Sequence, residues 1–136
     1  MSIQVFTANT ITDQIFFDPS VTFAAGLLRF IGLVVTESSV EANVEYAMRA
    51  LTATSMRFLI NQNTMNGVTV ITLRRNGVDT GIVLSIGIGA TGTFTANGSV
   101  VYADEDLISI SFDTTASGGG TIAANTRGDV TVVRSG

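Results

Sequence analysis

The stretch Gly67–Ile88, GVTVITLRRNGVDTGIVLSIGI, decides the fold, because turn chemistry and side-chain periodicity agree there. Two alternating runs flank Asn76-Gly77. Asn tolerates positive φ and Gly adopts it freely, so Asn-Gly between alternating runs predicts a type I′ β-hairpin. Alternate residues then share one face of the sheet. That face is predicted to carry Thr69, Ile71, Leu73, Ile82, Leu84, Ile86 and Ile88, and the opposite face Gly81, Val83, Ser85 and Gly87.

Further β-rich or alternating runs follow at spacings of roughly ten residues, separated by turns rich in Gly and Asn. We predict a strand from about Leu28 after a turn or short helix, because the run Val21–Val35 fits both spacings. A second tight turn is predicted at Asn97-Gly98. The other predicted strands are Asn43–Ala50, Thr54–Asn61, Ala90–Thr95, Ser99–Tyr102, Leu107–Asp113, which has one buried side, and Gly128–Arg134. About eight strands of this kind are typical of an all-β antiparallel sandwich or jelly roll.

The 136-residue chain is long enough for one domain with a real core, which we place at residues 21–136. The first 20 residues contain only short apolar pairs and end near the single proline, Pro19. We predict an extended N-terminal arm that docks either on its own sheet or on a neighbouring chain. Its predicted contact residues are Val5, Phe6, Phe16 and Phe17.

The composition excludes several classes of function. The net charge is −4 and the one adjacent basic pair is Arg74-Arg75, which argues against a nucleic-acid partner. The chain lacks Cys and His, so thiolate chemistry, Cys-ligated zinc and the commonest general base are excluded. The run Val21–Val35 is interrupted by Arg29 and is shorter than the roughly 20 residues of a membrane span. The N-terminal sequence MSIQVFTANTITDQ does not resemble a secretion signal.

Acidic and glycine-rich segments are the remaining candidates for chemistry. Asp104-Glu105-Asp106 offers carboxylates for a hard cation, but the spacing of a calcium loop is missing, so the sequence favours a solvated turn. The run Ser117–Gly120 and the glycines at 87, 89 and 92 lack the Lys and the following helix of a phosphate loop, which indicates turns. We therefore predict no enzymatic activity, no cofactor and no metal site.

Exposed Arg and Tyr side chains leave further alternatives. Arg74-Arg75 is a possible site for a phosphate or a sulfated sugar, although an ion pair to Asp79 or plain exposure fits better. Tyr46 and Tyr102 suit either a sugar platform or, more commonly, packing at an interface.

Three segments carry a resemblance to a known group: VEANVEYAMRALTATSMRFLINQN, VTVITLRRNGVDTGIVLSIGIGATGTF and YADEDLISISFDTTASGGG. Together they resemble small β-sandwich domains of tailed-phage virion proteins, which are similar to the trimeric jelly roll of the tumour necrosis factor and C1q type. The resemblance covers roughly Leu28 to the C-terminus. It implies a homotrimer, with the following residues at the trimer interface or in the core: Tyr46, Phe58, Ile110 and Phe112. The arm Met1–Pro19 and the absence of a collagen-like stalk depart from that group.

The resulting hypothesis is a structural virion protein on the capsid surface. A homotrimer assembled in the host cytoplasm would bind the major capsid protein and stabilise the shell as a decoration or cement protein. The alternative is a receptor-binding module at a tail or fibre tip, with glycan contacts from the loops Gln62–Asn66 and Thr114–Gly120.

Overall fold

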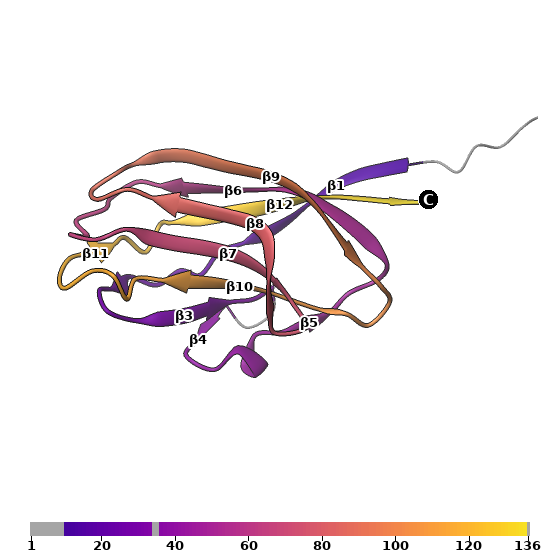
Figure 1. Cartoon of the computed structure of the whole chain (residues 1–136), viewed down its shortest axis with the longest axis horizontal. Helices are drawn as coiled ribbons and strands as arrows, with labels where there is room; N and C mark the ends of the chain where they lie inside the picture. The colour runs from indigo at the N-terminus through magenta and orange to yellow at the C-terminus, as the bar shows by residue number, and fades with distance from the viewer. Residues whose placement is uncertain (1–9, 34–35, 136) are drawn as a thin grey trace, which may run out of the picture.

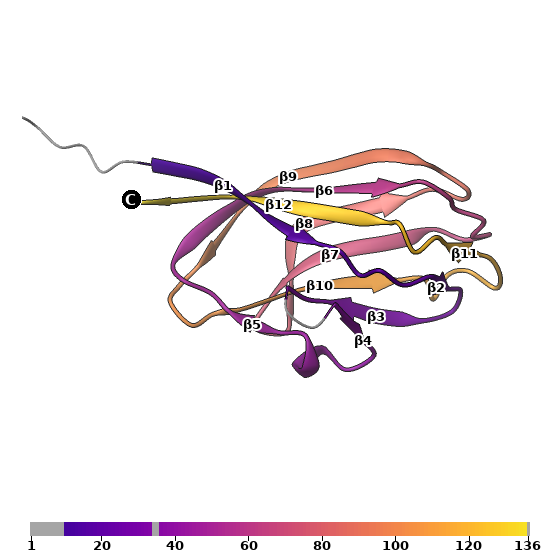
Figure 2. The ribbon, with the colours of Figure 1, turned by 180° about the vertical axis from the view of Figure 1, so that it is seen from behind.

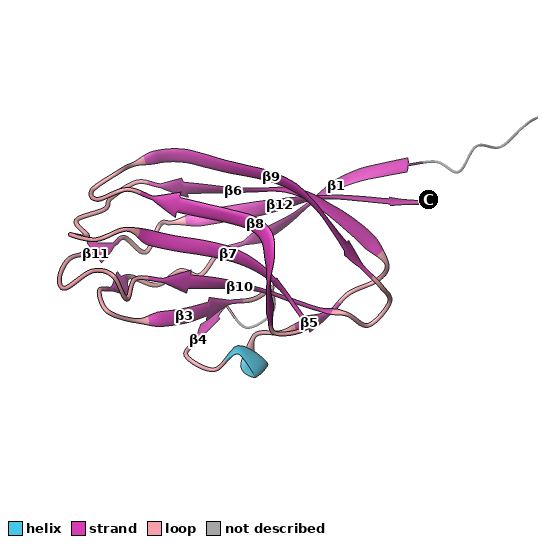
Figure 3. Cartoon of the chain, viewed as in Figure 1, coloured by secondary structure: helices cyan, strands magenta, loops and turns pink. Residues whose placement is uncertain are grey.

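The computed structural model describes residues 10–33 and 36–135. It is built almost entirely of antiparallel β-strands (Figure 3). Within the described residues the helical element is a single 3-10 turn, η1 (Glu41–Asn43). The strands are β1 (Thr10–Phe17), β2 (Phe23–Ala24), β3 (Leu28–Ile31), β4 (Glu37–Ser38), β5 (Tyr46–Ala47), β6 (Leu51–Ile60), β7 (Thr69–Arg75), β8 (Val78–Ile86), β9 (Gly92–Tyr102), β10 (Leu107–Asp113), β11 (Thr121–Ile122) and β12 (Arg127–Ser135).

The strands form two layers, seen from opposite sides in Figures 1 and 2. Sheet 1 has four strands in the order β1-β12-β6-β9. Sheet 2 has the order β4-β3-β10-β7-β8, with β5 added to one end of β10, and β11 forms a small separate pair with β2. The apolar sides of the two sheets face each other, so the fold is an all-β sandwich.

The long strands pair in a nested order around the β7–β8 turn. The innermost pair is β7–β8, and outside it come β6–β9, then β3–β10, then β1–β12. Asn76 and Gly77, in the innermost turn, have φ of 52° and 74°, as a type I′ turn requires. Each further pair joins segments more distant in sequence, until Thr10 lies opposite Ser135.

Aromatic and branched side chains from both sheets fill the space between the layers. Phe112 of β10 stacks on Phe23 with ring centroids 3.9 Å apart, and the Phe58 ring of β6 packs edge-on against Phe112 with centroids 6.4 Å apart. All three rings are at most 2% exposed. Each such side chain contributes about 1.5–3 kcal/mol on burial, so this cluster joins the two sheets firmly.

The predicted faces of the central hairpin agree with the structure at all positions except one. The inward positions from Thr69 to Ile86 are buried, but Ile88 is 67% exposed because β8 ends at Ile86. The predicted strand Leu107–Asp113 matches β10. Its Ser109 and Ser111 are nevertheless buried, so β10 is covered on both faces rather than on one.

The prediction of a strand at Asn43–Ala50 is wrong. This segment contains the end of η1 and only the two-residue strand β5. Val44 and Met48 are buried as the alternation suggests, but the Met48 backbone bonds to the β9–β10 turn, to Asp106 O (2.8 Å) and from Glu105 N (2.7 Å). Backbone hydrogen bonds to this turn therefore take the place of a longer strand pairing between β5 and β10.

The predicted turn at Asn97-Gly98 is also wrong, because both residues lie inside the continuous strand β9. The pairing with β6 jumps from Ala53↔Val100 to Ser55↔Asn97, so β9 carries one residue more than β6 at this point. The permissive Asn-Gly sequence is used here for a β-bulge instead of a chain reversal.

The N-terminal arm needs a correction for its second half. Residues Thr10–Phe17 form β1 and pair with β12 along their whole length. Phe17 is 1% exposed and belongs to the core of its own domain, so this segment docks on its own sheet, the first of the two predicted alternatives, and a contact of Phe17 with a shell or a neighbouring chain is wrong. The segment read as isolated apolar pairs is an alternating edge strand with Ile15 and Phe17 facing inward. Val5 and Phe6 lie outside the described residues.

Candidate functional site

The outer face of sheet 1 is the strongest candidate for an interaction surface. On all four strands, alternate side chains turn away from the core, and most of them are uncharged. The face consists of Thr12, Gln14, Phe16, Thr52, Ser55, Arg57, Leu59, Thr93, Thr95, Asn97, Val101, Asp129, Thr131 and Val133. Phe16 is 68% exposed beside Asp129, and Val101 is 60% exposed beside Thr52 toward the other end of the face.

An ion pair lies in the middle of this face. Arg57 donates to Asp129 Oδ2 from Nε (3.1 Å) and from Nη2 (2.8 Å). The Asp129 carboxylate side chain is 9% exposed, whereas the Arg57 side chain is half exposed. The pair cancels the two charges that would oppose covering this face with another apolar surface.

One hollow borders the ion pair, and a second lies toward the other end of the face. One has a volume of about 410 Å³ and is lined by Phe16, Leu59, Thr93 and Arg127 together with the ion pair. The other, about 400 Å³, lies between Val101, Val133 and Arg134. The face is therefore uneven, with hollows beside its protruding apolar side chains.

Predicted interface residues divide between the core and the surface. Phe58, Ile110 and Phe112 lie in the core with 0% exposure. Tyr102 is also completely buried. Tyr46 is 45% exposed on the short strand β5 and borders a separate hollow. The outer face of sheet 1 was not predicted as a unit, because the residues come from four strands whose neighbours are fixed only by the topology.

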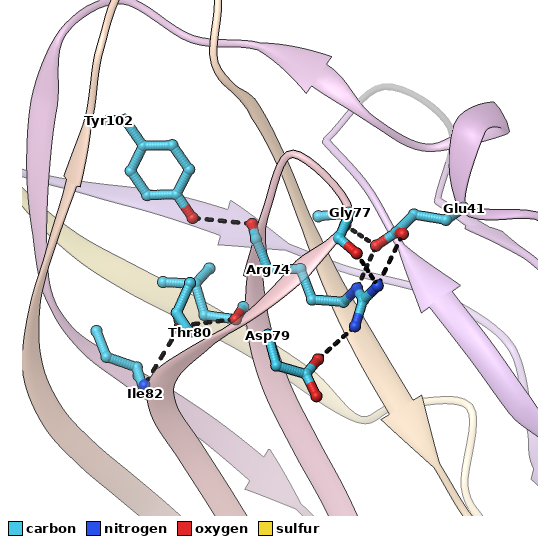
Figure 4. A network of polar contacts seen from close by, with 9 residues as sticks. Glu41, Arg74, Gly77, Asp79, Thr80, Ile82 and Tyr102 are labelled. Carbon is cyan, nitrogen blue, oxygen red and sulfur yellow. Dashed lines mark hydrogen bonds and ion pairs between the residues drawn. The ribbon is translucent and has the colours of Figure 1, made fainter.

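The hairpin end of the sandwich holds a dense polar network, shown in Figure 4. The Arg74 guanidinium bonds to the carboxylates of Glu41 and Asp79 and to the Gly77 carbonyl. Its carbon lies 5.6 Å from the centre of the Phe30 ring. These contacts occupy the Arg74 donors, so the arrangement favours a structural ion pair over a phosphate site.

Tyr102 and Arg75 connect this network to sheet 1. The Tyr102 hydroxyl donates to Arg74 O (2.9 Å), and Arg75 Nη1 donates to Val101 O (2.7 Å). Burial raises the pKa of the Tyr102 hydroxyl above its ordinary value. A buried, bonded Tyr102 is therefore part of the core and does not form a sugar platform.

The acidic turn is used to hold backbone segments. Asp104 Oδ1 accepts a bond from Ala50 N (2.9 Å), and Asp106 accepts from Asn76 Nδ2 (3.0 Å) and Ala103 N (2.9 Å). Within residues 10–33 and 36–135, no three carboxylates are grouped closely enough for a metal ion. The carboxylates of this turn therefore hold neighbouring loops together by hydrogen bonds.

The two loops proposed for glycan contacts bind each other. Asn66 Oδ1 accepts bonds from Gly118 N (2.8 Å) and Gly119 N (3.2 Å), and Ser117 Oγ accepts one from Gly67 N (2.9 Å). Asn66 Oδ1 and Ser117 Oγ are thus engaged within the fold.

Neither models of protein families nor curated proteins give a match to this chain. Among the residues that the structure describes, no helix has the length and apolar character needed to cross a bilayer.

Proposed function

We propose that this chain is a structural virion protein: a homotrimeric jelly-roll subunit that decorates a capsid and cements its major capsid subunits. The strand order supports the fold part of the proposal. A jelly roll is two four-stranded sheets in which a long hairpin has been rolled up, so that its pairs are split between the sheets. The nested pairs around Asn76-Gly77, with β1–β12 and β6–β9 in one sheet and β3–β10 and β7–β8 in the other, support a jelly roll as the proposed topology.

The proposal of self-association rests on the outer face of sheet 1. Phe16 and Val101 protrude from it, and its central charges, Arg57 and Asp129, neutralise each other. Protruding apolar side chains around a neutralised ion pair are the basis for proposing an interface here, and soluble homo-oligomers usually close by rotational symmetry. Three copies meeting through this face would bury it around a threefold axis.

Sedimentation of a paired set of variants tests the self-association. The wild-type chain is expected to sediment as a trimer at micromolar concentration, and Phe16→Ser with Val101→Ser is expected to give a folded monomer. Val83→Ser is the matched control, because Val83 is 42% exposed on the outer face of sheet 2. A monomeric wild-type chain, or equal effects of both variants, would contradict the proposal.

Attachment to the shell is assigned to the segment before β1, which contains Val5 and Phe6. Deleting residues 2–9 is expected to leave the trimer folded but to abolish binding to shells that lack the protein. Deleting residues 2–18 is expected to unfold the subunit as well, because it removes β1 and the buried Phe17.

Co-sedimentation with such shells, with mass spectrometry of the stoichiometry, measures both deletions. Three arms in one trimer act together, so the loss of binding should be steep. Unchanged binding after deletion of residues 2–9 would show that the anchor lies elsewhere.

A further inference from the structure

The sequence contains three Asn-Gly pairs, and the fold treats each of them differently. In such a pair the Gly backbone nitrogen, after losing its proton, attacks the Asn side-chain carbonyl carbon. The amide nitrogen leaves as ammonia, and a five-membered succinimide forms. Water then opens the ring to aspartate or isoaspartate. Glycine favours the attack because it has no Cβ to hinder the approach.

Asn66-Gly67 is locked at both reacting groups. The attacking nitrogen, Gly67 N, donates its proton to the buried Ser117 Oγ (2.9 Å). The Asn66 side chain is held by bonds from Gly118 N and Gly119 N. A Cβ on Gly67 would lie 2.3 Å from Ala116 O, so there is no room for the rearrangement that ring closure needs.

Asn76-Gly77 is exposed, but its side chain is tethered away from the attacking nitrogen. Asn76 Nδ2 donates to Asp106 Oδ1 (3.0 Å), and Asn76 Oδ1 accepts from Leu107 N (2.8 Å). Ring closure in the folded chain therefore has to break two hydrogen bonds to the β9–β10 turn and β10.

Asn97-Gly98 lacks the side-chain restraint found at the other two pairs. Both residues are exposed, and the pairing register passes from Asn97 to Val100, leaving Gly98 and Ser99 without a partner residue in β6. Among the described residues, no side-chain hydrogen bond holds Asn97, in contrast to Asn66 and Asn76. A Cβ on Gly98 would lie 2.8 Å from Ile82 Cγ1, which belongs to a side chain, whereas the close contact at Gly67 is with backbone.

We propose that Asn97-Gly98 is a self-modification site at which the folded chain deamidates, while the other two Asn-Gly pairs are protected by the fold. The product adds one negative charge to the outer face of sheet 1. Isoaspartate also inserts one backbone atom into β9, at the bulge that already accommodates an extra residue. If that face forms the proposed trimer, the modification weakens the assembly as the protein ages.

Peptide mapping by mass spectrometry after incubation at mildly alkaline pH tests the proposal on the full chain. In the dilute native protein, Asn97 is expected to react roughly tenfold or more faster than Asn66 and Asn76, because these require local opening. In urea all three should react at similar rates, which assigns the difference to the fold. Asn97→Gln is the control that should abolish the native signal, because a Gln side chain forms the ring far more slowly. Faster reaction at Asn66 or Asn76, or no reaction in the native chain, would overturn the proposal.

Repeating the mapping across protein concentrations separates this inference from the proposed function on which its consequence rests. Slower reaction at Asn97 only where the trimer forms supports both. A concentration-independent rate in a protein that trimerises supports the modification site and places Asn97 outside the interface. A chain that stays monomeric while Asn97 reacts first contradicts the trimer and leaves the site established.

Discussion

The two ends of the sandwich are closed by different physical means. At the hairpin end, most side-chain contacts involve charged groups: Arg74 forms ion pairs with Glu41 and Asp79, and Asn76 donates a hydrogen bond to the Asp106 carboxylate. At the loop end, neutral amides and hydroxyls make the bonds, and two chain segments approach closely where a glycine leaves room. The hairpin end therefore depends on charge, and the loop end depends on shape.

The loop end should be the less forgiving of the two. A Cβ on Gly120 would lie 2.1 Å from Thr64 O, which is backbone and cannot move aside as a side chain does. At the hairpin end, the Cβ of a residue replacing Gly77 would meet the tip of Glu41 at 3.4 Å, a contact that a small rotation relieves. Close backbone contacts tolerate change less than ion pairs with flexible side chains.

Gly120→Ala is expected to have the largest effect. It places a methyl group against the Thr64 backbone and forces φ of +102° on a residue with a side chain, so the free energy of unfolding should fall by about 3–5 kcal/mol. Urea unfolding measures the loss. Gly81→Ala is the control, because nothing lies within 4 Å of the added methyl group, and it should be close to neutral. Similar midpoints for the two variants would show that the loop end is not tightly packed.

Arg74→Met should rank second. The side chains of Arg74 and Glu41 are 18% and 16% exposed, so removing the cation leaves a largely buried carboxylate whose remaining contact is Ser109 Oγ (2.8 Å). The expected loss is about 2–3 kcal/mol. Arg49→Met, at an exposed position, is the control. If both variants unfold at the same urea concentration, the network does not stabilise the hairpin end.

Gly77→Val should rank third and still exceed every single substitution in the acidic turn. The φ of +74° at this position costs a β-branched residue about 1–2 kcal/mol. Thermal unfolding of Gly77→Val beside Asp106→Ala gives the comparison. A larger loss for Asp106→Ala would mean that the turn is held mainly by its side-chain bonds and not by its backbone conformation.

Local signals in the sequence predicted much of the hairpin end. Asn76-Gly77 and the alternation around it sufficed for the turn and the two strands, and the Arg74–Asp79 pair follows from the register that the turn imposes. Glu41 was not predicted as a partner of Arg74, because these residues are brought together by the path of η1 over sheet 2.

Non-local features were harder to predict. Asn97-Gly98 has the same sequence signal as Asn76-Gly77, yet it forms a bulge, because β9 continues along β6 on both sides of it. Likewise Phe16-Phe17 gives no sign of which ring is buried until β1 is paired with β12. The outer face of sheet 1 depends on the order of four strands, which no single segment encodes.

The smallest effect expected concerns pH, and it separates the two ends most cleanly. The Asp106 pKa is lowered, chiefly by the hydrogen bond from the Asn76 side chain and further by the Ala103 N–H and the Arg75 charge. A carboxyl whose pKa is lower in the folded state stabilises the protein above its unfolded pKa of about 3.9, and this contribution is lost as the pH falls through the folded pKa.

The difference in stability between the wild-type chain and Asp106→Asn should therefore be constant near neutral pH and shrink below about pH 4. Asn66→Ala removes only neutral hydrogen bonds at the loop end, so its cost should not change over the same range. Urea titrations of the three proteins at several pH values measure this, and a pH-dependent cost at Asn66 would show that the loop end also depends on charge.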